Sequence, residues 1–208
     1  LPVVDMVTGL NAVIGVLLAL HERKTSGLGQ LVDAALYDSG LSLLHPHAAN
    51  WFMSGQLPQR TGNAHPNIYP YDVVRTGGAP VFLAVGNDRQ FALLCRHIGR
   101  PELAQDARFA SAGQRSVNRV ELKALLEAAL TQADELMAIG VPAAAVLNVE
   151  QALTHPHTLH RQMVVKMGSY TGLGAPVKLS RTPATYRHAP LSEGRDFGPD
   201  EGPDLGTC

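Results

Sequence analysis

The amino-acid sequence predicts an α/β protein, and three observations support this fold class. Near the N-terminus an apolar helical pattern, a glycine-rich turn and a short strand-like run follow one another, which is the rhythm of an α/β layer. In the middle of the chain, a hairpin pattern comes first, and apolar residues at helical spacing come after it. A long connector without apolar periodicity separates these two parts, so we place a domain boundary there.

The N-terminal part opens with a long apolar run, for which we expect a helix over residues 6–24. Asp5 stands before the run and is a good N-cap residue, whereas Gly27 ends the helix. Residues 30–34 are strand-like, and the run behind them predicts a second helix that continues to about Met53.

The middle part begins with "YDVVRTGGAPVFLAVGN", which predicts a hairpin of two apolar strands around Gly77 and Gly78. A helix capped by Asp88 and stopped by Gly99 should follow. Residues 120–130 have apolar side chains at helical spacing and predict a further helix. "GVPAAAVLN" has the composition of a strand.

The C-terminal part predicts a helix in "VEQALTHPHTLHRQM", broken at Pro156, and then two extended segments about a glycine-rich turn. The end of the chain is rich in Gly, Asp and Pro, lacks a core pattern and is expected to be disordered. The expected divisions are a first part of a large domain (1–55), a linker (56–67), a small domain (68–150), a segment that returns to the large domain (151–190) and a tail (191–208).

Composition excludes several classes of function. The 208 residues carry a formal net charge of -1 and no basic cluster, which argues against nucleic-acid binding. The apolar run of about 15 residues is shorter than the roughly 20 needed to span a bilayer, and no signal-peptide pattern surrounds it, so we expect no membrane partner. Cys95 and Cys208 show no metal or redox spacing and suit a reducing compartment, so we expect a cytoplasmic protein.

Asp5 is the first candidate for chemistry. A carboxylate at a helix N-terminus can act as a cap, and the same position keeps it ionised through the helix dipole and free amide hydrogens. An ionised and oriented carboxylate is what covalent catalysis by aspartate requires. Both roles are open and they are compatible.

The stretch "RTGNAHPNIYPYD" is the second candidate. It could be a rigid connector, because Pro66 and Pro70 stiffen it. It could instead form a lid or wall over a site, in which Asn63, His65 and Tyr71 offer hydrogen bonds.

The histidines do not predict a metal site. The densest groups are His45 with His47, and His155 with His157 and His160, and no carboxylate or cysteine completes a ligand set at a familiar spacing. We therefore expect no metal.

Six stretches together resemble class III CoA-transferases of the CaiB/BaiF type, the formyl-CoA and carnitine-CoA transferase family, which also includes α-methylacyl-CoA racemases. They stand in the family's order, over residues 3–183, as "VVDMVTGLNAVIGVLLALHERKTSGLGQLVDAALYDS", "RTGNAHPNIYPYDV", "LAVGNDRQFALLCRHIGRPELAQDARF", "NRVELKALL", "GVPAAAVL" and "GAPVKLSRTP". The resemblance implies part of a large open-sheet, Rossmann-like domain plus a smaller α+β domain.

By motif position the resemblance makes Asp5 the catalytic nucleophile. It implies transfer of CoA from an acyl-CoA thioester to an acceptor carboxylic acid through a covalent aspartyl intermediate, with the CoA thioester as substrate and no permanently bound cofactor. It also implies an interlocked homodimer. The glycine-rich loop of formyl-CoA transferases is replaced here by "NAHPNIYP", which predicts a stiffer loop and a different acceptor acid.

The resemblance leaves two alternatives. A racemase-type member would use Asp5 for proton transfer at the carbon next to the thioester. The chain also opens at Leu1, directly before its apolar helix, and the family's N-terminal half, which supplies most of the CoA-binding surface, does not precede it. We therefore expect a piece of a longer protein, which could act only in assembly as a non-catalytic fragment.

Overall fold

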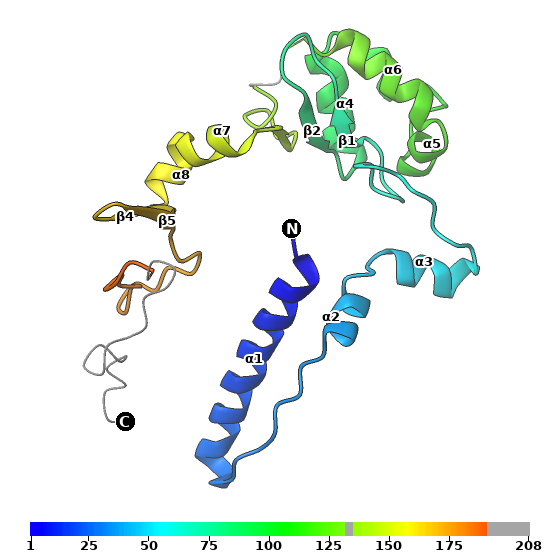
Figure 1. Ribbon diagram of the computed structural model, residues 1–208. Coiled ribbons are helices and arrows are strands. Elements are labelled where there is room, and N and C mark those ends of the chain that lie inside the picture. Colours follow the sequence, from blue (N-terminus) through cyan, green and yellow to red (C-terminus); the bar gives the residue numbers. More distant parts are fainter. Residues whose placement is uncertain (132–134, 191–208) are drawn as a thin grey trace. The chain divides into compact units, whose positions relative to one another are not determined.

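The structure is a computed structural model that describes residues 1–131 and 135–190 (Figure 1). It divides into two units, Leu1–Ala145 and Val146–Cys208. The residues from 191, where we expected a disordered tail, lie outside the described residues. In chain order the elements are α1 (Val3–Ser26), α2 (Leu36–Ser42), α3 (His47–Ser54), β1 (Tyr71–Val74), β2 (Val81–Ala84), α4 (Asp88–His97), the 3-10 helix η1 (Pro101–Ala104), α5 (Ala112–Val117), α6 (Arg119–Ala129), β3 (Ala143–Ala145), α7 (Val149–Thr154), α8 (Pro156–His160), β4 (Val164–Met167) and β5 (Tyr170–Leu173).

The helix expected at the N-terminus is present as α1, but it begins earlier than its apolar run. Pro2 occupies the cap position without a side-chain hydrogen bond, and Asp5 is the third residue of the helix. The expectation that Asp5 caps the helix is therefore wrong. The fixed φ of proline suits a helix start, which extends the helix beyond the residues that the apolar period marks. The stop is confirmed: Gly27 has a φ of 75° and its N–H donates to the Arg23 carbonyl.

α1 packs against α2 and the extended segment between them, yet none of its residues is buried. Asn11 donates a hydrogen bond to the hydroxyl of Ser39 on α2 (3.1 Å). A Cβ at Gly15 would stand 2.6 Å from Cγ1 of Val32, so the glycine permits this close approach. α1 is also long and apolar enough to cross a membrane by length and composition alone, a test that core helices of soluble proteins pass as well.

Two expectations for the residues after α1 are wrong. Residues 30–34 are extended but form no strand, because no neighbouring strand among the described residues supplies a hydrogen-bonded partner. The single helix expected up to Met53 is divided into α2 and α3. Pro46 stands at the cap position of α3, and a proline disfavours helical geometry in the residue before it.

The hairpin of the middle part is confirmed. β1 and β2 pair antiparallel, with Tyr71 opposite Ala84 and Val74 opposite Val81, and β3 adds antiparallel to the other edge of β2. Alternate residues of β1 and β2 are buried, as expected for strands with one face on a core.

α4 follows the hairpin, but its cap differs from our expectation. The side chain of Asn87 accepts a hydrogen bond from the Gln90 N–H, so Asn87 is the N-cap and Asp88 is the first residue of the helix. Gly99 has a φ of 70° after the helix end, as its expected role as a stop requires. The helix over residues 120–130 is confirmed as α6.

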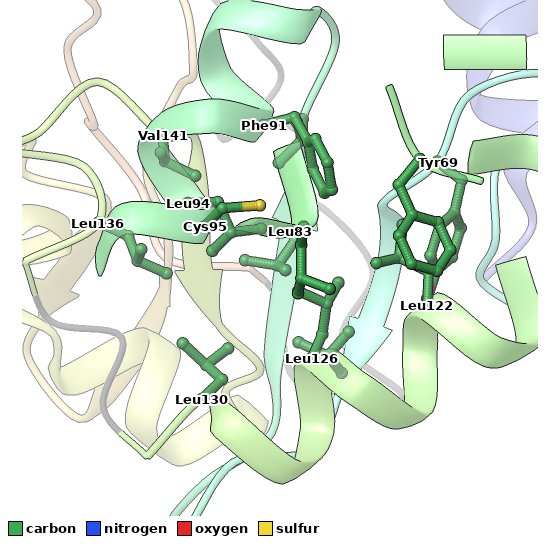
Figure 2. Close-up of a cluster of buried hydrophobic side chains, with 14 of the residues drawn as sticks. Tyr69, Leu83, Phe91, Leu94, Cys95, Leu122, Leu126, Leu130, Leu136 and Val141 are labelled. Atoms are coloured by element: carbon green, nitrogen blue, oxygen red, sulfur yellow. The ribbon is translucent and has the colours of Figure 1, made fainter. Parts of the chain in front are cut away.

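The hydrophobic core lies between the three-stranded sheet and the helices that follow it (Figure 2). Cys95 is fully buried, as expected of a small apolar residue, and burial raises the pKa of its thiol to about 11. The fully or almost fully buried side chains of this core are Tyr69, Val74, Val81, Leu83, Val85, Phe91, Leu94, Cys95, Leu103, Phe109, Leu122, Leu126, Leu130, Leu136 and Val141.

The second unit contains two short helices and a hairpin. The expected break is confirmed, since α7 ends at Thr154 and α8 begins at Pro156. β4 and β5 pair antiparallel, with Val164 opposite Leu173. The described residues thus form a mixed α/β structure with two small antiparallel sheets. The large open sheet is not among the elements they form, and it stays a prediction for the protein.

Candidate active site

Asp5 lies in the first turn of α1 with an exposed side chain. Within the described part of the chain, its carboxylate makes no hydrogen bond or ion pair. The first N–H groups of a helix and its macrodipole favour a negative charge at this position. The side chain is therefore available for reaction with a molecule that approaches this end of the helix.

The loop between α3 and β1 is held by hydrogen bonds from two sides. On α6, Arg119 donates to the carbonyls of His65 (3.3 Å) and Pro66 (2.9 Å). The amide groups of Asn50 and Asn67 pair reciprocally, at 2.8 and 3.0 Å, and so join α3 to the loop. These contacts hold the loop backbone, which favours a wall over a freely moving flap.

Arg115 supports the end of the same loop from inside the core. Its buried guanidinium donates to the carbonyls of Tyr69 (3.1 Å) and Phe109 (3.0 Å) and to the carboxylate of Asp88 (2.7 Å). It also lies 4.6 Å from the centre of the Phe91 ring. A buried arginine with all these partners joins the loop to α4 and to the core.

His65 is held in one neutral form by its neighbours. Its Nδ1 accepts hydrogen bonds from the N–H groups of Asn67 (3.1 Å) and Ile68 (3.2 Å), so in the neutral ring the proton is on Nε2. Desolvation, and then the positive charge of Arg119, lower the pKa of His65 below its usual value. At neutral pH the side chain therefore offers an uncharged Nε2–H donor.

Of the other loop candidates, Tyr71 lies with His65 and Asn63 does not. The ring of Tyr71 lies 5.2 Å from that of His65 and edge-on to Phe82 at 5.5 Å. The exposed Asn63 lines a separate polar cavity of about 780 Å³, together with residues that include Asp72 and Lys123. The structure thus brings together two of the three predicted loop residues.

The histidine groups remain without metal-binding geometry across residues 1–131 and 135–190. In that part of the chain, no three side chains of His, Cys, Asp or Glu gather closely enough to hold an ion. His157 and His160 share a helix, with ring centres 6.4 Å apart.

Comparison with known protein families decides where the chain belongs. The family model of CoA-transferase family III matches residues 1–196. The chain belongs to CoA-transferase family III. This confirms the resemblance inferred from the six motifs.

Two curated relatives illustrate the match. The chain is 36% identical to an acetyl-CoA:oxalate CoA-transferase of Acetobacter aceti over 182 residues, which covers 85% of the chain and 47% of the relative. It is 33% identical to a succinyl-CoA:mesaconate CoA-transferase of Haloarcula marismortui over 217 residues, which covers 98% of the chain and 54% of the relative. The chain spans about half the length of these relatives.

Solved structures with a similar fold agree with this assignment. A CaiB/BaiF family protein from Brucella suis superposes with a TM-score of 0.68 at 38% identity, over 88% of the chain and 50% of that protein. A hypothetical protein of Mycobacterium tuberculosis superposes with a TM-score of 0.73 at 27% identity, over 89% of the chain and 51% of that protein.

Sequence reasoning missed the residues that hold the loop of this family member. Arg115 and Arg119 lie 46 and 54 residues from the loop carbonyls they bind, Tyr69 and His65. An arginine within a helical pattern reads as an exposed polar residue. Neither its spacing nor its neighbours in "QRSVNRVEL" indicate such contacts.

Proposed function

We propose that these residues carry the nucleophile of a CoA-transferase that moves CoA from an acyl-CoA thioester to an acceptor carboxylic acid. The observation that carries the proposal is the family match over residues 1–196, together with relatives whose names describe CoA transfer to oxalate, mesaconate and glutarate. Each of these acceptors is a dicarboxylate. A dicarboxylic acid is therefore the acceptor we propose for this protein.

Asp5 is the proposed nucleophile. Its carboxylate oxygen attacks the thioester carbonyl, the C–S bond breaks, and a mixed aspartyl anhydride and CoA thiolate result. The thiolate then attacks the aspartyl carbonyl, releases the donor acid and leaves CoA on Asp5 as a thioester. Two covalent steps replace one difficult acyl exchange.

The acceptor acid completes the cycle by the same chemistry in reverse. Its carboxylate attacks the aspartyl thioester and displaces CoA thiolate, which forms a second anhydride. The thiolate attacks the acceptor's carbonyl in this anhydride, so the new acyl-CoA leaves and the Asp5 carboxylate is restored. Hydrogen-bond donors near the reacting carbonyl stabilise the negative oxygen that develops in each step.

The loop supplies candidates for binding the acceptor. The Nε2–H of His65 and the hydroxyl of Tyr71 are hydrogen-bond donors on neighbouring side chains, and Asn63 adds an amide nearby in sequence. A neutral His65 binds a carboxylate through a hydrogen bond and does not trap it as a full ion pair. We assign His65 and Tyr71 to selection of the acceptor acid, whereas Asn63, which lines a separate cavity, stays a candidate on its sequence position alone.

The proposal includes the assembly in which this chemistry takes place. The apolar side chains of α1 are exposed in this chain, and an interlocked homodimer in the cytoplasm would offer surfaces that cover them. The acyl-CoA and the carboxylic acid are then the small-molecule partners.

The test replaces Asp5 and compares it with a matched residue. Asp38 is also an exposed aspartate and is also the third residue of its helix, so Asp38→Ala controls for loss of a charge in a first turn. Asp5→Ala in the protein as the cell makes it should lower transfer to a panel of dicarboxylic acids at least about a thousandfold, whereas Asp38→Ala should not. Mass spectrometry after incubation with acyl-CoA should locate a CoA adduct on Asp5.

Near-normal turnover in Asp5→Ala, or an adduct on another residue, would overturn the assignment. Exchange of the proton next to the thioester, without transfer between acids, would indicate the racemase alternative. If the unmodified protein shows neither transfer nor proton exchange, it acts only in assembly.

A further inference from the structure

Arg119 carries a charge that no carboxylate of the described chain balances. Its half-buried guanidinium donates to three backbone carbonyls, those of Ser116 (3.0 Å), His65 (3.3 Å) and Pro66 (2.9 Å). Within residues 1–131 and 135–190 it forms no ion pair, whereas its neighbour Arg115 does. These bonds use three of the five N–H groups of the guanidinium. A cation that has lost part of its hydration and lacks a counter-ion favours an anion beside it.

Arg119 lines a cavity of about 560 Å³, together with residues of α3, of the segment behind α3 and of the loop. Among the described residues that line it there is no aspartate or glutamate, so an anion in the cavity meets no repulsion from its walls. Amide side chains, such as those of Gln56 and Gln59, form part of the polar wall, and Met53 and Leu57 form part of the apolar wall. The cavity therefore suits an anionic group on a short hydrocarbon chain.

We propose that Arg119 determines specificity for the acceptor acid, because the cavity takes the second carboxylate of a dicarboxylic acid. This inference rests on the proposed function, in which His65 and Tyr71 select the acceptor. Arg119 binds the carbonyl of His65, so the cavity adjoins that residue. The remaining N–H groups of the guanidinium bind the carboxylate through charge-assisted hydrogen bonds, and the methylene groups lie against the apolar wall. The volume lies in the range of small-molecule sites.

The first test compares glutarate with butyrate, the same acid without one carboxylate, by NMR titration of the full chain at low salt. Glutarate should bind at least roughly tenfold more tightly, the effect of one charge-assisted hydrogen bond. Arg119→Gln should remove this preference, because glutamine keeps a polar side chain but no charge. Arg60→Gln is the matched control: it removes an exposed cation that does not line the cavity, and it should keep the preference.

A second variant leaves the bonds between Arg119 and the loop in place. Gln59→Glu puts a negative charge on the wall of the cavity and should weaken binding of glutarate roughly tenfold, through repulsion of the bound carboxylate. Gln105→Glu adds the same charge at an exposed position that does not line the cavity, so it should bind glutarate as the unmodified chain does. This pair tests the cavity even if Arg119→Gln disturbs the loop.

The transfer assay separates recognition of the second carboxylate from a structural role. In the protein as the cell makes it, Arg119→Gln should raise the KM for glutarate at least roughly tenfold and change the KM for butyrate by less than about twofold. If Arg119 only holds the loop, both KM values rise together.

Three results would overturn the proposal. The first is equal binding of glutarate and butyrate to the unmodified chain. The second is a preference for glutarate that survives in Arg119→Gln. The third is an equal loss in Gln105→Glu and Gln59→Glu, which would show a diffuse charge effect. The binding measurements need neither Asp5 nor turnover, so their outcome is separate from that of the transfer assay.

Discussion

The helices α6 and α1 carry similar leucine side chains in opposite surroundings. Leu122 and Leu126 of α6 are fully buried, whereas Leu17 and Leu18 of α1 are 61% and 64% exposed. Both helices form where the sequence places them. The comparison teaches that an apolar pattern predicts a helix and its apolar faces, but not whether the same chain contains the residues that cover them.

The patterns of the two helices differ in one respect that explains this outcome. In α6 the leucine side chains follow one side, and the sheet and α4 with their core side chains cover that side (Figure 2). In α1 the apolar side chains occupy every side, a pattern typical of a helix surrounded by protein. The α2 segment covers only part of that surface. The curated relatives are about twice as long, so their folds have more residues with which to surround such a helix.

The largest expected effect separates the two helices by one substitution. Leu126→Ala removes a fully buried side chain and should lower the free energy of unfolding of its domain by about 2–5 kcal/mol. Leu17→Ala in this chain should change stability by less than about 0.5 kcal/mol, because the side chain is already mostly exposed and alanine favours a helix. Urea unfolding with hydrogen exchange measured by segment checks both.

Equal destabilisation by the two substitutions would break the comparison, because it would mean that α1 is covered in solution. Measuring the same two substitutions in the assembled protein makes the comparison of the helices more specific. If α1 is a core helix there, the cost of Leu17→Ala should rise toward that of Leu126→Ala.

Much of the local structure could be predicted from the residues themselves. Gly27 and Gly99 both end helices, and the hairpin around Gly77 forms as expected, because each depends on a few neighbouring residues. The strand expected at residues 30–34 was not found, because a strand needs a partner that its own sequence does not specify. The cap of α4 was misplaced by one residue, since adjacent Asn87 and Asp88 are both good caps.

The candidate site also combines features that depend on neighbouring residues with features that depend on distant ones. The position of Asp5 at the start of an apolar helix could be read from the sequence, whereas the contact between Arg119 and the His65 carbonyl could not. Arg119 lies 54 residues away, and its contact depends on how α6 packs beside the loop. Long-range contacts of this kind follow from the folded core rather than from local preference.

A smaller effect should come from the arginine that joins the loop to the core. Arg115→Met keeps much of the volume but leaves the carbonyls of Tyr69 and Phe109 without their donor, and it should cost about 3 kcal/mol. The ion pair adds little, because Asp88 is two-thirds exposed. Arg89→Met removes an exposed guanidinium from α4 and should cost less than about 0.5 kcal/mol. Thermal unfolding of both variants would show the difference.

A neutral result for Arg115→Met would place the loop's stability elsewhere. If Arg115→Met does lower stability, Arg115→Lys tests whether the planar geometry of the guanidinium is needed. Lysine keeps the charge but lacks the planar fork, so it should recover only part of the loss.

The smallest expected effect concerns the pH dependence of the loop. The pKa of His65 is lowered by desolvation, by Arg119 and, to a lesser degree, by His45 and His47. The unfolded chain has the ordinary value, so between the lowered folded pKa and about 6.5 the unfolded state binds more protons and stability rises with pH. Unfolding free energies measured from pH 5 to pH 7.5 should therefore increase more steeply in the unmodified chain than in His65→Asn.

Asparagine keeps an acceptor for the N–H groups of residues 67 and 68 but does not titrate. Identical pH profiles for the two proteins would mean that His65 has its ordinary pKa in the folded chain and that Arg119 does not lower it.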